Sequence, residues 1–247
     1  FRSLTRPPPA PRPARLIILA LAALTLTGCQ SISSQFAQVR FIDASPDLPA
    51  VDAYQNSTAI AYNLGFGTVT SYIFTAPTSY AFSLDSAGSQ QQLAGLHAAL
   101  LSGGGQYTVL AGNVAAGLQL TLLKDQTIPA PSGDVALRLI DQTTRTGPVD
   151  IYLVPSGEPL AGIAPFATTL PFGNAPVYID VPANTYSIVA LPAGADPAPV
   201  PSPLYSSPQA TQPSGSVRTL VLIDTQPPAS GSLQLITADD FAPPPAI

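Results

Sequence analysis

The feature that most constrains the fold of this chain is an internal repeat. The motif "VRFID" at Val39–Asp43 returns as "LRLID" at Leu137–Asp141, and "VDAY" at Val51–Tyr54 returns as "VDIY" at Val149–Tyr152. Both pairs are separated by 98 residues. Motifs that recur at a fixed spacing are typical of chains in which one structural unit occurs more than once. The repeat therefore predicts two copies of one domain in tandem.

Later motifs repeat in the same order but at larger spacings. "LGFG" at Leu64–Gly67 matches "LPFG" at Leu170–Gly173, and "LQLTLLKD" at Leu118–Asp125 matches "LQLITADD" at Leu233–Asp240. Loops that are longer in the second copy would increase the spacing in this stepwise way. We expect the first copy to span residues 37–126 and the second to span 135–241, with a Pro-rich linker at 127–134 and a tail at 242–247.

The local pattern within each copy indicates β-strands. Apolar residues alternate with polar ones around Val39 and Phe41, and again along Leu118, Leu120 and Leu122. Clusters of Gly, Pro, Asn and Ser interrupt these runs every eight to twelve residues, as turns do between short strands. The predicted fold class is all-β: two antiparallel, immunoglobulin-like β-sandwich domains.

The N-terminal segment has the organisation of a bacterial export signal. Arginines precede the charge-free run "LIILALAALTL", and small residues then lead to Cys29, the only cysteine of the chain. Leu26–Cys29 resembles the lipobox of bacterial lipoproteins. This resemblance implies cleavage after residue 28, lipidation of Cys29 including a fatty acyl chain such as palmitate, and a short tether at 29–36. The expected location is the bacterial cell envelope, at the outer membrane, and the alternative is an ordinary secretory signal.

The charge balance excludes one class of partner. Without residues 1–28, five basic residues remain beside all fourteen acidic ones, a formal net charge of −9. A chain with no basic stripe cannot neutralise nucleic-acid phosphates, so nucleic-acid binding is not expected. The predicted partners are the membrane, through the lipid anchor, and envelope proteins or glycans.

The segment "VRFIDASPDLPAVDAY", residues 39–54, resembles the opening of the DUF4397 family, a domain of unknown function. That family joins a V-R-F strand to an A-S-P-D turn and a V-D-x-Y strand. The first copy continues the resemblance with Phe66-Gly67, "APTSY" and "GQYTV", and the second keeps "PANTY" but has "QTTRTGP" at the turn. The family commonly has His before Ala-Ser-Pro, where this chain has Asp43. The resemblance implies tandem extracytoplasmic β-sandwiches with no established activity.

Two sets of charged residues are candidates for sites. Asp43, Asp47 and Asp52 surround one turn, and oxygen-rich clusters of this kind bind calcium, although hydrogen bonds to local backbone are the alternative. Arg40 and Asp52 recur as Arg138 and Asp150, which predicts one structural, cross-strand ion pair inside each domain. No cofactor is expected.

Catalysis has little support in the sequence. His97 is the only histidine and Glu158 the only glutamate, and no nucleophile motif accompanies either residue. A hydrolase is therefore the weakest of three hypotheses. The favoured hypothesis is a non-catalytic envelope lipoprotein that presents two β-sandwich modules for structural or adhesive interaction, and the alternative is a glycan- or calcium-binding module.

Overall fold

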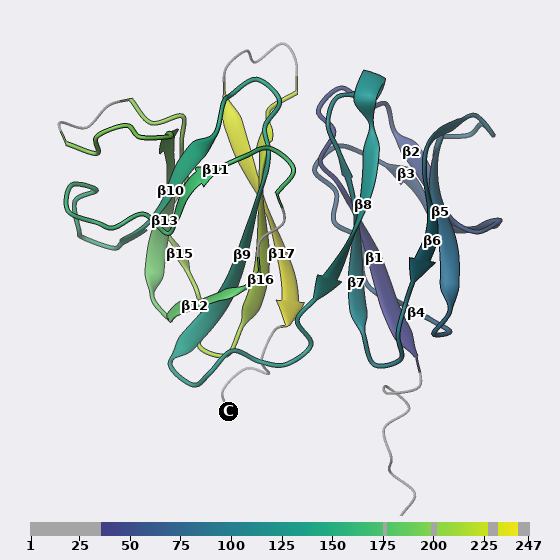
Figure 1. Ribbon diagram of the computed structural model, residues 1–247, viewed down its shortest axis with the longest axis horizontal. Coiled ribbons are helices and arrows are strands. Elements are labelled where there is room, and N and C mark those ends of the chain that lie inside the picture. The colour runs from purple at the N-terminus through teal and green to yellow at the C-terminus, as the bar shows by residue number, and fades with distance from the viewer. Residues whose placement is uncertain (1–35, 175–176, 199–201, 227–231, 242–247) are drawn as a thin grey trace, which may run out of the picture.

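In the computed structural model, residues 36–174, 177–198, 202–226 and 232–241 are described, and they form an all-β protein (Figure 1). The N-terminal half contains β1 (Ala37–Asp43), β2 (Val51–Gln55), β3 (Thr58–Leu64), β4 (Ile73–Thr75), β5 (Ser79–Ser86), β6 (Gln92–Leu100), β7 (Gln106–Gly112) and β8 (Gln119–Asp125). The C-terminal half contains β9 (Asp134–Gln142), β10 (Val149–Pro155), β11 (Ala167–Leu170), β12 (Ile179–Pro182), β13 (Thr185–Pro192), β14 (Tyr205–Ser206), β15 (Ala210–Thr211), β16 (Val217–Asp224) and β17 (Leu233–Phe241).

The strands form four sheets that stack as layers. The outer N-terminal sheet, β3-β2-β5-β6, packs on the inner N-terminal sheet, β4-β1-β7-β8. The inner C-terminal sheet, β12-β9-β16-β17, packs on the outer C-terminal sheet, which has the order β11-β10-β13-β14 and carries β15 on β13. The two inner sheets face each other in the middle of the molecule, where a third apolar core joins the halves (Figure 1).

One pairing in each half departs from the antiparallel sheets that the sequence predicts. β1 runs parallel to β7, and β9 runs parallel to β16, whereas the other strand pairs among the described residues are antiparallel. Parallel strands are characteristically covered on both faces, because the sheets that contain them lie between other layers. These two parallel pairs form the centres of the inner sheets.

The "VRFID" motif is buried on both faces of its strand for the same reason. Phe41 packs into the core of the N-terminal half, while its neighbour Ile42 packs into the core between the halves. Leu139 and Ile140 divide in the same way on β9. The period-two alternation is therefore real, but the face that carries Arg40 is turned toward the other half rather than toward solvent.

The recurring Phe-Gly motif has a conformational cause. Gly67 and Gly173 adopt φ values of 77° and 74°, which residues with a Cβ rarely take. The amide of Gly67 donates to the carbonyl of Asp43 at 2.9 Å, and that of Gly173 donates to Asp141 at 2.8 Å. Each glycine thus lets a loop turn back onto the end of its central strand.

The outer sheets differ at one edge. The N-terminal half has the nine-residue strand β6, whereas the corresponding edge of the C-terminal half has only β14 and β15, each two residues long. Pro208 lies between these short strands, and proline cannot donate a ladder hydrogen bond. Residues 205–211 thus add only two short strands to this edge of the sheet.

Cys29 and the predicted signal segment lie outside the described residues. Within the described ranges, no helix has the length and apolar character needed to cross a membrane.

Candidate functional site: the interface between the halves and its grooves

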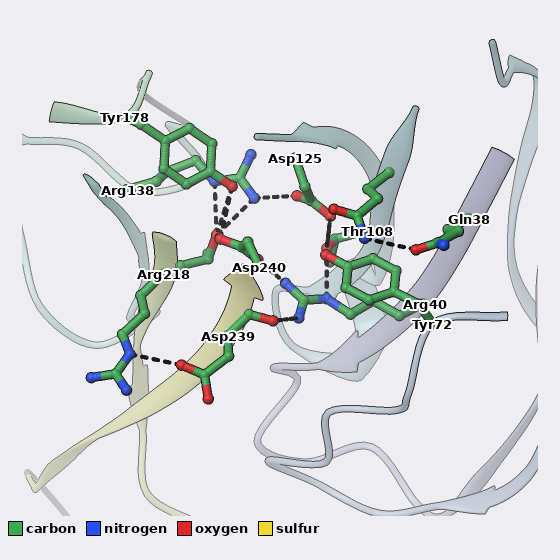
Figure 2. A network of polar contacts seen from close by, with 12 residues as sticks. Gln38, Arg40, Tyr72, Thr108, Asp125, Arg138, Tyr178, Arg218, Asp239 and Asp240 are labelled. Atoms are coloured by element: carbon green, nitrogen blue, oxygen red, sulfur yellow. Dashed lines mark hydrogen bonds and ion pairs between the residues drawn. The ribbon is translucent and has the colours of Figure 1, made fainter. Parts of the chain in front are cut away.

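A network of buried charged and polar side chains lies between the two inner sheets and joins the halves (Figure 2). We call it the clasp. It consists of two arginines, two aspartates, two threonines and two tyrosines, which are Arg40, Arg138, Asp125, Asp240, Thr108, Thr219, Tyr72 and Tyr178.

Arg40 reaches from the N-terminal half to the last strand of the C-terminal half. Its Nη2 donates to Asp240 Oδ1, and its Nη1 donates to the carbonyl oxygen of Asp239 at 2.9 Å. Its Nε donates to Thr108 Oγ1 at 2.9 Å, and Thr108 lies directly beside it on β7. One guanidinium therefore bonds both its own sheet and the sheet opposite.

Arg138 makes the reciprocal contacts. Its Nη2 lies 2.5 Å from Asp125 Oδ1, its Nη1 donates to the Lys124 carbonyl at 3.0 Å, and its Nε donates to Thr219 Oγ1 at 3.0 Å. The two halves thus exchange equivalent contacts, as the two partners of a symmetric dimer do.

Each aspartate of the clasp has further partners in its own half. Asp125 Oδ2 accepts from Thr108 Oγ1 at 2.6 Å and from the Tyr72 hydroxyl at 2.7 Å. Asp240 Oδ2 accepts from Thr219 Oγ1 at 2.7 Å, and the Tyr178 hydroxyl donates to the same oxygen at 2.8 Å. Buried charges need this many partners because they have lost the stabilisation that water provides.

The tyrosine rings cover the arginines. The centroid of the Tyr72 ring lies 4.5 Å from Arg40 Cζ, and that of Tyr178 lies 4.6 Å from Arg138 Cζ, both within cation–π range. Burial, and next the neighbouring aspartates, raise the pKa of each tyrosine well above its usual value. The tyrosines therefore stay neutral and donate to the carboxylates.

Burial also raises the pKa of Asp240, and the Arg40 guanidinium opposes that change. Both ion-paired aspartate side chains are fully buried. In contrast, the ion pair between Arg218 and Asp239 lies at the surface, where Asp239 is 55% exposed. The ion pairs of the clasp are therefore desolvated. Removing one partner of such a pair destabilises a protein much more than removing one partner of a surface pair.

The predicted ion pairs within each domain are wrong. Asp52 lies on β2 in the outer sheet, while Arg40 points from β1 to the opposite side, so they cannot meet. Asp52 instead accepts from the amides of Asn63 and Gly88, at 2.8 and 3.0 Å.

Asp150 has the same role in the C-terminal half, although the sequence predicts a pair with Arg138. It accepts from the amides of Thr169 and Gly194, at 2.7 and 2.8 Å. The repeated Arg and Asp residues are thus structural, but each has a different partner from the predicted one.

The three aspartates proposed for calcium do not come together. Asp43 Oδ1 accepts from the Ser45 amide at 3.0 Å, and Asp47 Oδ1 accepts from the Ala115 amide at 2.7 Å. Asp52 also accepts from backbone amides, so all three are hydrogen-bond acceptors, but only Asp43 bonds the local backbone that the alternative expects, while Asp47 and Asp52 bond amides of other segments. Among the described residues, no three His, Cys, Asp or Glu side chains are grouped for metal binding.

Asp43 and Asp141 are nevertheless unusual. Each is buried at the end of a central strand, and its Oδ2 has no hydrogen-bond partner. Burial raises the pKa of Asp43 to about 6 and also raises the pKa of Asp141. Buried carboxyls with such pKa values make the free energy of unfolding depend on pH.

The two candidates for catalysis are separate and exposed. His97 lies on the edge strand β6, and Glu158 lies in the turn after β10. They belong to different halves, and the structure does not join them in one site.

Two grooves flank the contact between the halves. The larger, of about 540 Å³, is lined by Thr121, Lys124, Gln126, Val177 and Tyr178, with Arg138 at its floor. The second, of about 400 Å³, is lined by Phe36, Gln38, Gln106 and Phe241. Volumes of a few hundred Å³ are typical of small-ligand sites.

Sequence reasoning missed the clasp partners Asp125, Asp240, Tyr72 and Tyr178, although a signal for them existed. Both aspartates occupy the same place in a repeated motif, and both tyrosines precede a repeated isoleucine. A polar residue that recurs at equivalent places near apolar strands can be sought as a partner for a recurring arginine.

Comparisons with known proteins give one family match. Residues 37–152 match the family model described as "Domain of unknown function (DUF4397)", which confirms the resemblance over the N-terminal half and the first strands of the C-terminal half. No curated protein matches the chain.

Two solved structures are similar to the chain, and both are of proteins that bind glucans. A family CBM26 module, CBMbc, from Eubacterium rectale Amy13K in complex with maltoheptaose has 11% identity and a TM-score of 0.24, and the alignment covers 84% of this chain and 98% of that one. A structure titled "Alpha-glucan binding by a streptococcal virulence factor" has 10% identity and a TM-score of 0.25, covering 75% of this chain and 92% of that one.

Proposed function

We propose that this chain is a non-catalytic protein of the bacterial cell envelope that is anchored through lipid on Cys29. It presents two copies of one β-sandwich module as a single rigid unit for structural or adhesive contact. The observation that carries this proposal is the clasp, together with the apolar core beside it. Domains in one chain move against each other unless a buried apolar interface joins them, so this interface presents both modules in one fixed orientation.

The proposed duplication rests on corresponding contacts rather than on motifs alone. The inner sheets have equivalent strand orders, β4-β1-β7-β8 and β12-β9-β16-β17, each with its parallel pair in the middle. Each arginine binds the carboxylate and the preceding carbonyl on the last strand of the other half. Two modules descended from one self-associating ancestor would have this arrangement.

The assignment as non-catalytic draws on how the charged groups are used. In the clasp, the carboxylates accept hydrogen bonds from arginine, threonine and tyrosine, and the tyrosine rings cover the guanidinium groups. Groups engaged in this way are unsuited to exchanging protons with a substrate, which requires an accessible acid or base.

Subcellular fractionation of cells that express the Cys29→Ala variant tests the anchor. We expect the wild-type protein in the membrane fraction and the variant in the soluble fraction, because acyl chains hold a protein on a bilayer through their buried methylenes. Ser31→Ala is the matched control and should stay with the membrane. Unchanged membrane retention of Cys29→Ala would contradict the anchoring proposal.

Protease treatment of intact cells tests the direction in which the modules face. Digestion of both modules without lysis would place them on the cell surface and favour adhesion. Protection until the outer membrane is permeabilised would place them in the periplasm and favour a structural contact there.

A second candidate function is glycan binding, and the larger groove favours it. Its volume of about 540 Å³ can hold a few sugar units, and Lys124, Gln126 and Thr121 offer polar groups to hydroxyls beside the apolar Val177. Calorimetric titration with soluble envelope polysaccharides and a linear maltooligosaccharide tests it. We expect binding that the Lys124→Ala, Gln126→Ala double variant weakens at least fivefold and that His97→Ala leaves unchanged. Flat titrations with the wild-type protein would remove this candidate.

A further inference from the structure

One end of the N-terminal half carries a group of exposed apolar side chains. Of eight large apolar side chains that are exposed among the described residues, four lie there, and they are Phe36, Phe74, Leu100 and Ile128, exposed to 38%, 66%, 64% and 67%. We call these four residues the apolar end. The rings of Phe36 and Phe74 contact each other edge to face, with centroids 6.5 Å apart.

Strand register places the four residues at the same end. Phe36 immediately precedes β1. Phe74 of β4 pairs with Gln38, which follows Phe36 by two residues in the chain. Leu100 ends β6, and the loop that follows it is bound to Phe36, since the Gly104 amide donates to the Phe36 carbonyl at 2.8 Å.

Ile128 joins the group through β8. The last residue of β8, Asp125, pairs with Gln106 at the start of β7, and Gln106 pairs with Gln38 of β1. Ile128 follows three residues after Asp125, so it leaves the sheet at the level of Gln38 and Phe74.

The C-terminal half shows that the fold does not require apolar residues here. The position equivalent to Phe36 is Asp134, because Arg40 corresponds to Arg138. The position equivalent to Phe74 is Asp180, which pairs with Ala136 as Phe74 pairs with Gln38. An exposed phenylalanine costs solubility and adds nothing to a core, so its presence in one half only indicates a contact specific to that half.

The chain enters the N-terminal half at this end. Six residues separate Cys29 from Phe36, and six residues fully extended span about 20 Å. If Cys29 carries the lipid, as proposed above, the apolar end is the part of the described molecule that is held nearest to the bilayer.

We infer that the apolar end lies on the lipid bilayer, with Phe36, Phe74 and Ile128 in its interfacial region. Protein segments that lie on a bilayer bury Phe, Leu and similar apolar side chains at this depth. The inference rests on the proposed lipid anchor, which decides that this end of the molecule faces the bilayer. It also rests on Asp134 and Asp180, which show that the fold itself does not require phenylalanine at positions 36 and 74.

The charges near this end indicate which lipid surface it suits. Two basic residues with exposed atoms lie at this level, Lys124 beside Tyr107 and Arg218 beside Leu137, and Arg218 is already ion-paired with Asp239. Asp134 and Asp180 lie at the same end of the adjacent C-terminal half. Once the Arg218–Asp239 pair is set aside as neutral, one lysine opposed by two aspartates does not attract an anionic surface. The contact is therefore apolar, and we expect it on zwitterionic lipid with little dependence on salt.

A single tryptophan reporter tests the contact, because the chain has no tryptophan of its own. We would place it with Phe74→Trp in the full chain and reconstitute the protein on phosphatidylcholine vesicles with and without brominated acyl chains. We expect a blue-shifted emission at position 74 that brominated lipid quenches. Phe172→Trp is the matched control, because that exposed residue precedes Gly173, which binds the opposite end of β9, and its emission should not change.

Each other outcome has a defined meaning. Protein that floats with the vesicles while Trp at position 74 is not quenched would overturn the contact and leave the anchor intact. A Cys29→Ala chain that floats with the vesicles as well as the wild type would overturn the proposed lipid anchor. In that case, quenching of Trp at position 74 would support the bilayer contact and absence of quenching would overturn it. A blue shift that needs no vesicles and grows with protein concentration would show that a second copy covers the apolar end, and would overturn the proposal.

A second variant uses the residues of the other half. The double variant Phe36→Asp, Phe74→Asp has aspartate at both positions, as the C-terminal half has at Asp134 and Asp180. The fold should therefore be retained. In the Cys29→Ala background, we expect partition onto vesicles to fall by roughly tenfold for each phenylalanine removed. Unchanged partition by this variant, with a folded circular dichroism spectrum, would contradict the proposal.

Discussion

The two halves of the molecule have equivalent residues where their inner sheets face each other. They have different residues at the end where the chain enters the N-terminal half, at the start of β1. Arg40, Thr108 and Asp125 have their counterparts in Arg138, Thr219 and Asp240, with the same atoms bonded. By contrast, Gln38 and Gln106 pair on β1 and β7 where β9 and β16 have Ala136 and Val217. The comparison separates residues that hold the halves together from residues that each half uses on its own.

The difference between the Gln38–Gln106 pair and the Ala136–Val217 pair has a local cause. In the C-terminal half, Ala130 of the linker packs on Ala136 and Val217, together with Phe241. In the N-terminal half the equivalent place is a groove in which Gln106 Nε2 donates to Gln38 Oε1 at 2.7 Å. A position that is covered by the linker is apolar, and the uncovered one is polar.

The largest effect that we expect comes from breaking the clasp. Arg40→Ala and Arg138→Ala should each lower the free energy of unfolding by about 3–5 kcal/mol, because each leaves a buried carboxylate without its partner. Urea denaturation measures this. If the halves are equivalent in this respect, the two losses agree within about 1 kcal/mol. A large loss for one variant and none for the other would contradict the reciprocal arrangement.

The next effect concerns pH. The pKa of Asp43 in the folded state is about 6, above the usual value of 3.8, so the folded protein binds the proton more tightly than the unfolded chain. Stability from this group is fully present below pH 4 and is lost as the pH rises through 6, by about 3 kcal/mol in total. Asp43→Asn should remove this part of the pH dependence.

Urea denaturation of the wild type and Asp43→Asn between pH 4 and pH 7 measures that change. The difference between the two proteins isolates Asp43 from other groups that titrate in this range, including Asp141. A difference that is constant over the whole range would contradict the assignment.

A smaller effect is expected at the aspartates that cap loops in the outer sheets. Asp52→Ala and Asp150→Ala each leave two backbone amides without an acceptor and should cost about 2 kcal/mol of unfolding free energy. Asp47→Ala is the matched control with one exposed hydrogen bond, and should cost less than about 1 kcal/mol. A twofold greater loss in one half would show that the halves differ in these loops as well.

The smallest effect is expected at the surface ion pair. Arg218→Ala removes a pair whose partner Asp239 is largely exposed, and should change the free energy of unfolding by less than about 1 kcal/mol. This variant is the control for the clasp, because Arg218 also contacts β17 but is only half-buried and its partner Asp239 is largely exposed. A loss as large as that of Arg40→Ala would mean that burial does not distinguish the two kinds of pair.

Part of this account could be predicted from the sequence. The period-two alternation gives the strands, the all-β class follows from them, and the "FG" motif marks a turn whose positive φ favours glycine. The recurrence of Arg40 as Arg138 also marks these arginines as structural. All of these depend on neighbours in the chain or on direct repetition.

The partners of the arginines could not be predicted in the same way. A strand with period-two alternation has a second face, and the sequence does not say whether solvent or another sheet covers it. Assigning solvent to that face leaves only partners within the domain, and Asp52 is then a candidate because it recurs as Asp150 at the same spacing from the arginine. Asp240 lies 200 residues from Arg40, and only the stacking of the two inner sheets brings them together.

The central claim is that the clasp makes the two halves one unit, and hydrogen exchange measured by mass spectrometry at increasing urea concentrations tests it most directly. Peptides from β1 and β7 report on the N-terminal half, and peptides from β9 and β16 report on the C-terminal half. We predict that both sets lose protection at the same urea concentration in the wild type. Two separate midpoints, with one half still protected while the other exchanges, would contradict the claim.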